Sequence, residues 1–439
     1  MRPKVFRQIS GLRGKVILPG DKSIAHRAII LSSISRGKVQ IDNFPANVDC
    51  LVTLAAFKKL GVKSVLKKNN LIIFGRGLNG LKKPKGPIFL SESGTSFRLL
   101  LGVLAGQNFS TMLTAGPSLS VRPMRRVTEP LRKMGAQISS YLVDTIAHSE
   151  EYPPVEICGH AINGIDYKIP LASAQIKSAV LLAGLFAKGK TTVTELVRTR
   201  DHTERMLRSF KVKVGVRGKK ISVRGGQILK SPGKIFIPGD ISSAAFFMVA
   251  AAIVPDSEIL IENVSLNPLR IGVLKALKRM GVDIKLTIHI AQGEPVGDIT
   301  VKSSKLTGIK IESREIPSLI DELPILMVAA SFASGKSVFE GVGELRVKET
   351  DRIRSMTENL LSMGASIEVS KENGEENIVI NGVKVLRAAK VKSFGDHRTA
   401  MSMLIAGLVA SGPVKVDDLA CIRKSFPDFV KVLSKLKHG

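Results

Sequence analysis

A ten-residue stretch near the amino terminus, 19–28, has the residue types of an anion-binding site. It carries Lys22, Ser23 and Arg27 directly after a Pro-Gly break, and apolar residues at helical spacing follow. A helix should therefore begin near Ser23. The unpaired N–H groups and the dipole of a helix N-terminus favour anions, and two cations add to this preference. The stretch predicts a site for a phosphate or carboxylate group, although a capped surface helix with solvated cations shares the pattern.

A second stretch, 346–352, joins cations to a carboxylate. Apolar residues recur at helical spacing from Ile353 onward, so we expect a helix to start near Lys348. Lys348 and Arg352 would then lie one turn apart, with Glu349 between them. Two cations and one carboxylate at a helix start can bind a phosphorylated acid and still supply a proton.

Other polar clusters occur at comparable positions along the chain. They are 94–98, Arg122, Ser173 with Gln175 and Lys177, 200–205, Asp321-Glu322, 396–398 and Lys424. Each alone is compatible with a structural ion pair or a solvated helix start. We interpret His202 and His397 as structural imidazoles, because no spacing of His, Cys and carboxylate residues supports a metal site.

Internal repetition relates these clusters to one another, because almost all of them lie at the start of a repeated unit or at a strand-to-helix turn within it. About six copies follow one another, starting near residues 21, 93, 173, 238, 321 and 395. Each has a small-residue helix, a turn, a β-branched strand and an amphipathic helix. Most amphipathic helices close on Gly, which adopts the left-handed C-terminal conformation without steric cost; the third lacks this Gly. The first helices, such as 179–185 and 244–252, are apolar all round and should be buried.

The near-repeat of Pro19-Gly20-Asp21 at Pro238-Gly239-Asp240 predicts two domains. Residues 21–237 would form the first three-unit domain, and residues 1–20 with 238–439 the second. A hinge is expected near 19–22 and 237–240, where the chain would pass between them.

Composition narrows the class of partner. The 439 residues carry a formal net charge of +29 with no long basic tail, which points to nucleic acid, a membrane surface or small anionic metabolites. Trp is absent and no zinc or RNA-recognition signature occurs, so a nucleic-acid role rests on bulk charge alone. Cys50, Cys158 and Cys421 have no paired spacing and are expected to be buried thiols. Without a signal-like or membrane-length apolar segment, the sequence predicts a soluble cytoplasmic protein.

Taken together, the motifs resemble those of the EPSP synthase (3-phosphoshikimate 1-carboxyvinyltransferase) family, in the family's order along nearly the whole chain. The matching motifs are Gly20-Asp21-Lys22-Ser23 with His26-Arg27, Ser93-Gly94-Thr95, Arg122-Pro123-Met124, Ser173-Ala174-Gln175, 200–205, 346–352, Asp396-His397-Arg398 and 424–427.

The resemblance implies an α/β (α+β) fold of two globular domains. Each domain would hold three βαβαββ units in an inverse, barrel-like arrangement, with the active site in the interdomain cleft. It also implies transfer of the enolpyruvyl group of phosphoenolpyruvate to the 5-hydroxyl of shikimate-3-phosphate, in aromatic amino acid biosynthesis. No cofactor, metal, nucleic acid or membrane would take part, the protein would be a monomer, and glyphosate would bind in the phosphoenolpyruvate pocket.

The resemblance further assigns residues to each role. Shikimate-3-phosphate would be held by Lys22, Ser23, Arg27, Ser173, Ala174, Gln175, Arg200, Asp321 and Lys348. Phosphoenolpyruvate would be held by Lys22, Gly94, Arg122, Gln175, Arg352, Arg398 and Lys424. The implied catalytic residues are Asp321, Glu349, Lys22, Lys348 and His397. Glu349, assisted by His397, would protonate the methylene carbon. Asp321 would take or orient the hydroxyl proton, alone or with Lys348.

One departure and two alternatives stay open. Glu92 stands where the family usually has Asn, and its carboxylate could repel phosphoenolpyruvate unless it is turned away. The sister transferase acting on UDP-N-acetylglucosamine uses a loop cysteine, whereas no Cys lies between Cys50 and Cys158. A nucleic-acid-binding protein is the alternative from another class, and its affinity would fall steeply with salt.

Overall fold

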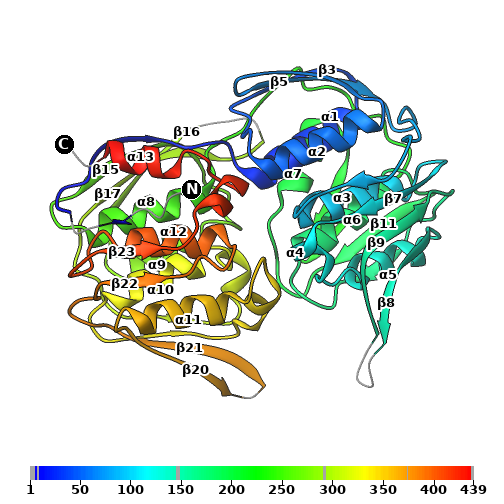
Figure 1. The fold of residues 1–439 in the computed structure, drawn as a ribbon. Helices are drawn as coiled ribbons and strands as arrows, with labels where there is room; N and C mark the ends of the chain where they lie inside the picture. The colour runs from blue at the N-terminus through cyan, green and yellow to red at the C-terminus, as the bar shows by residue number, and fades with distance from the viewer. Residues whose placement is uncertain (1–4, 7–8, 145–148, 290–292, 373, 437–439) are drawn as a thin grey trace. The chain divides into compact units, whose positions relative to one another are not determined.

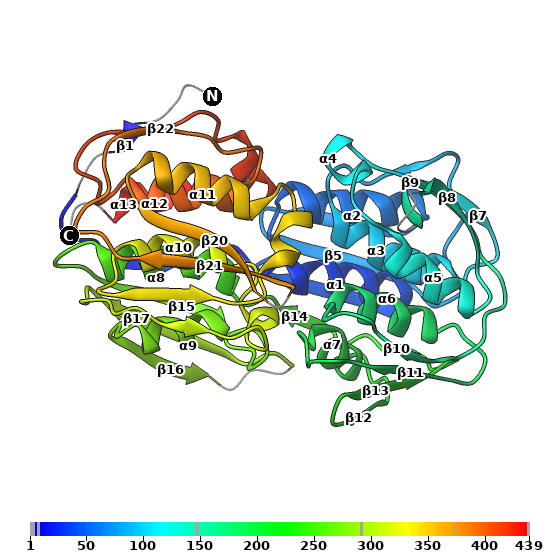
Figure 2. The same ribbon diagram turned by 90° about the horizontal axis from the view of Figure 1, so that it is seen from below.

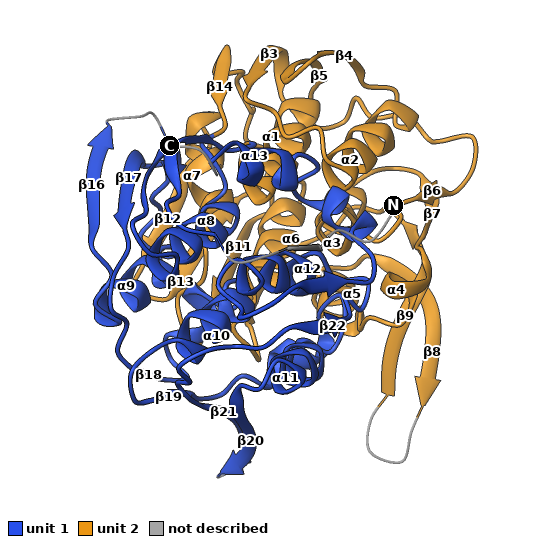
Figure 3. Cartoon of the chain, turned by 60° about the vertical axis from the view of Figure 1, so that its left-hand side comes forward, with its two compact units in different colours: residues 1–19, 238–439 blue, residues 20–237 orange. Residues whose placement is uncertain are grey.

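The computed structural model describes residues 5–6, 9–144, 149–289, 293–372 and 374–436. Contacts within the chain divide it into two compact units (Figure 3). Unit 1 comprises Met1–Pro19 and Pro238–Gly439, and unit 2 comprises Gly20–Ile237. The chain therefore passes from one unit to the other at each of its two Pro-Gly pairs.

Unit 2 contains three copies of one motif, in which two helices flank a central strand in the sequence, an antiparallel hairpin follows, and a further strand pairs parallel to the central strand. The first copy consists of β14 (Lys234–Phe236), α1 (Lys22–Ile34), β3 (Arg36–Asp42), α2 (Val48–Lys59), β4 (Lys63–Lys67) and β5 (Asn70–Arg76). The second consists of β6 (Ile88–Phe89), α3 (Gly94–Leu104), β7 (Ser110–Thr114), α4 (Pro117–Ser120), α5 (Arg125–Lys133), β8 (Gln137–Asp144) and β9 (Ser149–Cys158). The third consists of β10 (Asp166–Lys168), α6 (Ala174–Gly184), β11 (Lys190–Thr194), α7 (His202–Ser209), β12 (Val214–Arg217) and β13 (Lys220–Arg224).

Unit 1 repeats the motif twice in full, and in the described residues its third copy lacks the hairpin. Its first copy consists of β2 (Arg13–Ile17), α8 (Ile241–Ile253), β15 (Glu258–Ser265), α9 (Gly272–Arg279), β16 (Ile284–His289) and β17 (Val296–Lys302). Its second consists of β18 (Lys310–Ile311), η1 (Ile316–Ser318), α10 (Leu323–Ser331), β19 (Lys336–Phe339), η2 (Gly343–Val347), α11 (Arg352–Ser362), β20 (Ser366–Glu372) and β21 (Glu375–Asn381). Its third consists of β22 (Ala389–Val391), α12 (His397–Ala406), β23 (Val414–Val416), η3 (Ala420–Lys424) and α13 (Phe429–Lys435), with β1 (Val5–Phe6) added to its sheet.

The sheets confirm the predicted α/β fold of repeated βαβαββ units. Five sheets have four strands in the same order. The first strand of the hairpin lies at one edge, followed by the second hairpin strand, the central strand and the parallel strand, as in β4-β5-β3-β14. In the described residues the sixth is three-stranded, β1-β23-β22. The sheets stay separate and do not close into a barrel. The strand before α1, β2, pairs with β15 of unit 1, and the strand before α8, β14, pairs with β3 of unit 2.

The first helix of each copy lies in the interior of its unit, as its all-round apolar sequence predicts. In unit 1, α10 packs against both α8 and α12 (Figures 1 and 2). In unit 2, α3 packs against both α1 and α6. Of the 13 residues of α8, 12 are buried, which confirms the prediction for residues 244–252. The polar residues that start these helices therefore lie at the ends of a buried helical layer.

The closing glycines are confirmed as left-handed helix ends. Gly61, Gly135, Gly281 and Gly364 have φ angles of 84°, 105°, 89° and 82°. The third copy uses Lys211 at the same point, with φ of 65°. Its N–H donates to the carbonyl of Arg208 and that of Val212 to the carbonyl of Leu207, as at the glycine ends.

Lys211→Gly should stabilise unit 2. A side-chain-bearing residue pays about 1–2 kcal/mol in the left-handed region, and part of that gain is offset because glycine loses more entropy on folding. We expect a net increase of about 0.5–1 kcal/mol in the free energy of unfolding, measured by urea denaturation. Lys213→Gly is the matched control, since Lys213 does not have a positive φ and should gain nothing. Equal or lower stability of Lys211→Gly would contradict the prediction.

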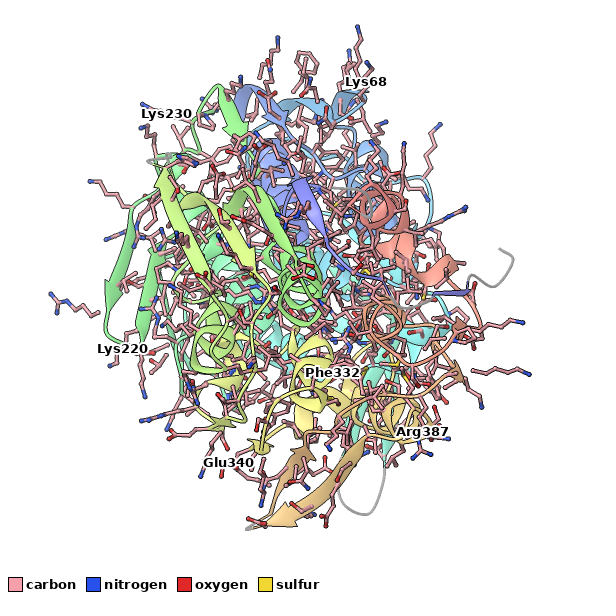
Figure 4. All side chains as sticks on the ribbon, turned by 90° about the vertical axis from the view of Figure 1, so that its left-hand side faces the viewer. Lys68, Lys220, Lys230, Phe332, Glu340 and Arg387 are labelled. Carbon is pink, nitrogen blue, oxygen red and sulfur yellow. The ribbon has the colours of Figure 1, made fainter. Side chains whose placement is uncertain are left out.

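Basic side chains account for the charge of the surface. Lys68, Lys220 and Lys230, for example, are exposed and extend into solvent (Figure 4). Within the described part of the chain, no helix has both the length and the apolar character needed to cross a bilayer.

Candidate active site

The predicted helix start at the first motif of unit 2 is confirmed. Helix α1 begins at Lys22, and the Asp21 carboxylate accepts a hydrogen bond of 2.9 Å from the Ile24 N–H. The Lys22 ammonium lies 2.9 Å from the carboxylate of Asp49, in the first turn of α2. Asp49 was not predicted; its position in the first turn of the following helix is the signal that could have found it.

Ser23 and Arg27 lie in different surroundings. Arg27 is buried and donates to the hydroxyls of Ser178 and Thr203, both at 2.7 Å, which joins α1 to α6 and α7. The hydroxyl of Ser23 lies 3.4 Å from Nη1 of Arg200. The structure thus brings together Ser23 and Arg200, separated by 177 residues in the sequence, and gives Arg27 a structural task at the same helix start.

The starts of α3 and α6 also meet. The Gln175 side chain accepts from Nη1 of Arg98 at 2.6 Å and donates to the Thr95 hydroxyl at 3.0 Å. A methyl group added to Gly94 would lie 3.1 Å from Nη1 of Arg122 and 3.2 Å from Nη1 of Arg98. Two guanidinium groups therefore approach the N-terminus of α3, an arrangement that favours an anion.

Three neighbours in the α6 motif separate into different environments. Ser173 caps α6 by accepting from the Ile176 N–H at 3.4 Å, and Ala174 is the first helical residue. Lys177 is fully buried, with its ammonium 2.8 Å from Glu204 and 3.1 Å from Glu195. Lys177 therefore forms ion pairs inside unit 2, whereas Gln175 forms hydrogen bonds with Arg98 and Thr95 at the start of α3.

The carboxylate of Glu92 is held by the chain itself. Its Oε2 accepts a hydrogen bond of 2.7 Å from the Leu119 N–H, near the start of α4. A methyl group on Gly116 would collide with Oε1, so the absence of a side chain there makes room for the carboxylate. The Leu119 N–H therefore satisfies one oxygen of this carboxylate.

His26 lies behind the α1 start in a chain of hydroxyls. Its Nδ1 shares a hydrogen bond of 2.7 Å with Thr53, which contacts Ser96 at 2.6 Å, and Ser96 contacts Ser93 at 2.6 Å. Burial, followed by the nearby charges of Lys22 and Arg27, lowers the pKa of His26 well below its usual value of 6.5. The imidazole is therefore neutral in the folded protein.

This environment predicts that His26 makes unit 2 less stable in mild acid. The unfolded chain takes up a proton on this histidine near pH 6.5, whereas the folded chain does not, so stability falls as the pH decreases below that value. From about pH 7.5 to about 5.5, wild type should lose about 1 kcal/mol more than His26→Asn, which keeps a polar atom toward Thr53. Parallel urea-denaturation curves across this pH range would contradict the prediction.

In unit 1, the helix expected to start near Lys348 begins later. Helix α11 starts at Arg352, capped by Asp351, whose carboxylate accepts from the Arg354 N–H at 3.0 Å. A short 3-10 helix ends at Val347, and Lys348 is extended. The prediction was wrong because the Asp351 cap outweighs the apolar periodicity, so the angular relation proposed for Lys348, Glu349 and Arg352 does not hold.

In unit 1, three carboxylates surround the guanidinium group of Arg352. Arg352 is 1% exposed and donates from Nε to Asp396 at 2.8 Å and from Nη2 to Glu349 at 2.5 Å, while Asp321 lies 3.6 Å from Nη1. Burial alone would lower the pKa of Arg352, but the charges of Asp396, Glu349 and Asp321 outweigh it and raise the pKa. Burial opposes ionisation of Asp396, yet Arg352 and then His397 keep the pKa of this carboxyl low.

The three carboxylates around Arg352 have different accessibility. Asp396 is fully buried and caps α12 by accepting from the N–H groups of Arg398 and Thr399. The side chains of Glu349 and Asp321 are 23% and 17% exposed. Asp396 therefore has a structural role as the cap of α12, whereas the side chains of Glu349 and Asp321 are accessible to a ligand.

The other predicted site residues of unit 1 are Arg398, Lys424, Lys348 and His397, and each has a different neighbour. Nη1 of Arg398 donates to the Asp321 carbonyl at 2.6 Å, and Lys424 Nζ lies 3.3 Å from the carbonyl of Gly395, just before α12. Lys348 pairs with Glu344 at 3.2 Å. His397 is buried, with Nδ1 3.9 Å from the Asp396 carboxylate.

The cysteines are free thiols in the structure. Cys50 and Cys421 are buried, as predicted, whereas Cys158 is only half-buried and accepts a hydrogen bond from Ser110 at 3.0 Å. Burial, followed by the charges of Asp396 and Asp418, raises the pKa of Cys421 to about 12. Cys421 therefore remains a protonated core thiol.

These features define a class of protein before any comparison. Each unit has three buried helices with polar residues at their N-termini. Cations lie at the starts of α1, α3 and α12, and unit 1 adds two accessible carboxylates. Helix N-termini and guanidinium groups bind phosphates and carboxylates, and carboxylates exchange protons. The class is a two-unit α/β protein with the side chains for acid–base chemistry on small anions.

Comparison with known proteins identifies the family. A family model described as EPSP synthase (3-phosphoshikimate 1-carboxyvinyltransferase) matches residues 6–433, so the chain belongs to the EPSP synthase family. The chain is 48% identical over 423 residues to the 3-phosphoshikimate 1-carboxyvinyltransferase of Geobacter sp. (strain M21), with 96% of each chain covered. It is 44% identical over 429 residues to that of Shouchella clausii (strain KSM-K16), covering 98% of this chain and 97% of the relative.

Solved structures agree with this family. An EPSP synthase from Acinetobacter baumannii matches with a TM-score of 0.85 at 42% identity, covering 99% of this chain and 97% of that one. The enolpyruvyl transferase NikO from Streptomyces tendae matches with a TM-score of 0.75 at 15% identity, covering 98% and 96%. At that identity the likeness to NikO concerns the fold alone.

Proposed function

We propose that this chain transfers the enolpyruvyl group of phosphoenolpyruvate to the 5-hydroxyl of shikimate-3-phosphate and releases phosphate. The observation that carries the proposal is family membership along residues 6–433, in a chain whose helix starts bear the cations and carboxylates this reaction needs. Both substrates are multiply charged anions, which suits the cation clusters of both units. The predicted cytoplasmic location, monomeric state and hinge near the two Pro-Gly pairs stay predictions.

The substrate assignments follow the clusters. We infer that shikimate-3-phosphate is held by Lys22, Ser23, Arg27, Ser173, Ala174, Gln175, Arg200, Asp321 and Lys348. We infer that phosphoenolpyruvate is held by Lys22, Gly94, Arg122, Gln175, Arg352, Arg398 and Lys424. The approach of Arg122 to Gly94 and of Arg200 to Ser23 supports these sets. Arg27 would act mainly by fixing the α1 start, because it is buried against Ser178 and Thr203.

The proposed reaction has two steps. The 5-hydroxyl oxygen bonds to C2 of phosphoenolpyruvate while Asp321, alone or with Lys348, accepts or orients the hydroxyl proton. Glu349, assisted by His397, delivers a proton to the methylene carbon. The adduct then loses phosphate and one proton from the methyl group, which restores the double bond. The accessible carboxylates of Glu349 and Asp321 beside Arg352 support this division of work.

A coupled phosphate-release assay tests the proposal. Phosphate should appear only when phosphoenolpyruvate and shikimate-3-phosphate are both present. Release with UDP-N-acetylglucosamine and none with shikimate-3-phosphate would assign the chain to the sister reaction. Oligonucleotide binding without phosphate release would favour the nucleic-acid alternative.

Gly94→Ala should weaken inhibition by glyphosate more than it weakens phosphoenolpyruvate binding. The added methyl group would press on Arg122 and Arg98 at 3.1 and 3.2 Å, so both guanidinium groups must shift, and the longer inhibitor tolerates less displacement. Wild type should be sensitive, because Glu92 is engaged by the Leu119 N–H. Inhibition and Michaelis constants of wild type, Gly94→Ala and Glu92→Asn provide the test. A tolerant wild type that Glu92→Asn makes sensitive would overturn this prediction.

A further inference from the structure

A buried ion pair lies next to Asp321 and has no role in the assignments above. Arg270 and Glu322 are 2% and 1% exposed, and Nη1 of Arg270 lies 3.0 Å from both carboxylate oxygens of Glu322. The Ser242 hydroxyl bonds to both partners, accepting from Nη2 of Arg270 and donating to Oε1 of Glu322. Removing two charges from water is costly, and well-packed apolar residues often stabilise such a position equally well. A buried pair of this kind therefore raises the question of a task beyond stability.

The position of Arg270 suggests that task. Its Nη2 lies 3.6 Å from Oδ2 of Asp321, whereas Arg352 and Arg398 approach Oδ1 of the same carboxylate at 3.6 and 3.8 Å. Cations thus flank both oxygens of Asp321, and Arg270 lies beside Oδ2. These cations also contact other carboxylates: Glu322 lies 3.8 Å from Arg398, and Glu349 and Asp396 pair with Arg352.

The supporting residues lie at the starts of two helices of unit 1 and in the turn before a third. Ser242 lies in the first turn of α8, Arg270 lies in the turn between β15 and α9, and Glu322, next to Asp321, occupies the N-cap position of α10. Glu322 holds Nη1 of Arg270 and the Ser242 hydroxyl holds Nη2, so the two contacts together fix the plane of the guanidinium group. Arg270 is therefore held by side chains from the starts of α8 and α10, two helices that pack against each other inside unit 1.

We propose that Arg270 is a positioning residue that holds the Asp321 carboxylate ionised and correctly oriented, and that Glu322 and Ser242 fix Arg270 for this purpose. The proposal rests on the proposed function, in which Asp321 accepts or orients the hydroxyl proton. Arg270 acts through Asp321 and does not contact the reacting atoms. An adjacent cation favours the charged form of a carboxylate, and an adjacent anion disfavours it. Arg270 and Glu322 therefore act on Asp321 in opposite directions.

The test compares the pH dependence of kcat in two variants. Arg270→Gln/Glu322→Gln replaces the ion pair by a neutral, hydrogen-bonding pair, so that no buried charge is left alone. With the cation beside Oδ2 gone, the acidic limb of the kcat profile should move to higher pH by about half a unit to one unit, and kcat should fall about tenfold. Glu322→Gln alone should move the limb to lower pH, because Arg270 then faces Asp321 without its counter-ion. The Michaelis constant for phosphoenolpyruvate should change less than about threefold in both.

A matched control separates positioning from a general structural role. Arg279→Gln/Glu315→Gln removes another Arg–Glu pair of unit 1, at 2.7 Å and partly exposed, and should leave the profile unchanged. The proposal would be overturned if the folded variants of the buried pair lose activity without any shift of the acidic limb. It would also be overturned if the acidic limb moves in the same direction in Arg270→Gln/Glu322→Gln and in Glu322→Gln.

A readout independent of activity keeps the two proposals distinct. The carboxyl carbon resonance of Asp321, assigned with Asp321→Asn, should titrate at higher pH in Arg270→Gln/Glu322→Gln than in wild type. If wild type releases no phosphate, the proposed function fails, and this titration still decides whether Arg270 holds Asp321 ionised. Unchanged titration in the variant would refute the positioning role even in an active enzyme.

Discussion

Arg122→Ala should lower kcat/KM by two to nearly four orders of magnitude. The loss corresponds to about 3–5 kcal/mol, the cost of leaving a buried anionic group without its charged partner. The structure gives the reason: the Arg122 guanidinium lies beside Gly94 at the N-terminus of α3, where Arg98 also points. An anion bound there would lose one of its two cations. Steady-state phosphate release with both substrates measures the effect.

Arg125→Ala is the control for this variant. Arg125 lies three residues further on, with a side chain that is 45% exposed and 4.0 Å from Glu129. Exposed ion pairs contribute little, so its removal should change kcat/KM less than about twofold. Comparable losses at Arg122 and Arg125 would show that the anion site does not lie at the α3 start.

Glu349→Gln should lower kcat by about two to four orders of magnitude with little change in the Michaelis constants. General acid–base groups contribute about this much, and Gln keeps the shape and the hydrogen bond while it removes the exchangeable proton. Glu349 accepts from Arg352 at 2.5 Å and is partly accessible, so its carboxyl group is held in place; in the proposed function its protonated form is the proton donor. Pre-steady-state phosphate release would place the loss in the chemical step.

Glu358→Gln provides the comparison on the same helix. Glu358 pairs with Arg354 at 2.5 Å, and both side chains are largely solvent-exposed. Its replacement removes an Arg–Glu pair of α11 without touching the cluster around Arg352, and kcat should stay within about twofold of wild type. If Glu349→Gln loses less than tenfold in kcat, or loses activity only through the Michaelis constants, Glu349 is not the proton donor.

Local features of the fold could be predicted from the sequence because their causes are local. Asp21 caps α1 through an N–H three residues away, and the closing glycines adopt positive φ because the next turn requires it. The buried first helices follow from residues that are apolar on every side. Repetition of these signals was enough to predict the α/β units and the helix starts at which polar residues gather.

Side-chain partners depended on the tertiary structure. Gln175 and Lys177 are two residues apart, yet Gln175 contacts Arg98 and Lys177 is buried against Glu204, because successive helix positions face different neighbours. The spacing near Lys348 predicted a helix that the cap at Asp351 delays.

The pair of Arg270 and Glu322 lies 52 residues apart in the sequence, so no local pattern announces it. The sequence by itself determined the repeated units and which helix starts carry charge. Only the tertiary structure determined which charged side chains form ion pairs with each other. Ion pairs and hydrogen bonds require atoms within a few ångströms, and the packing of elements distant in the sequence sets that distance.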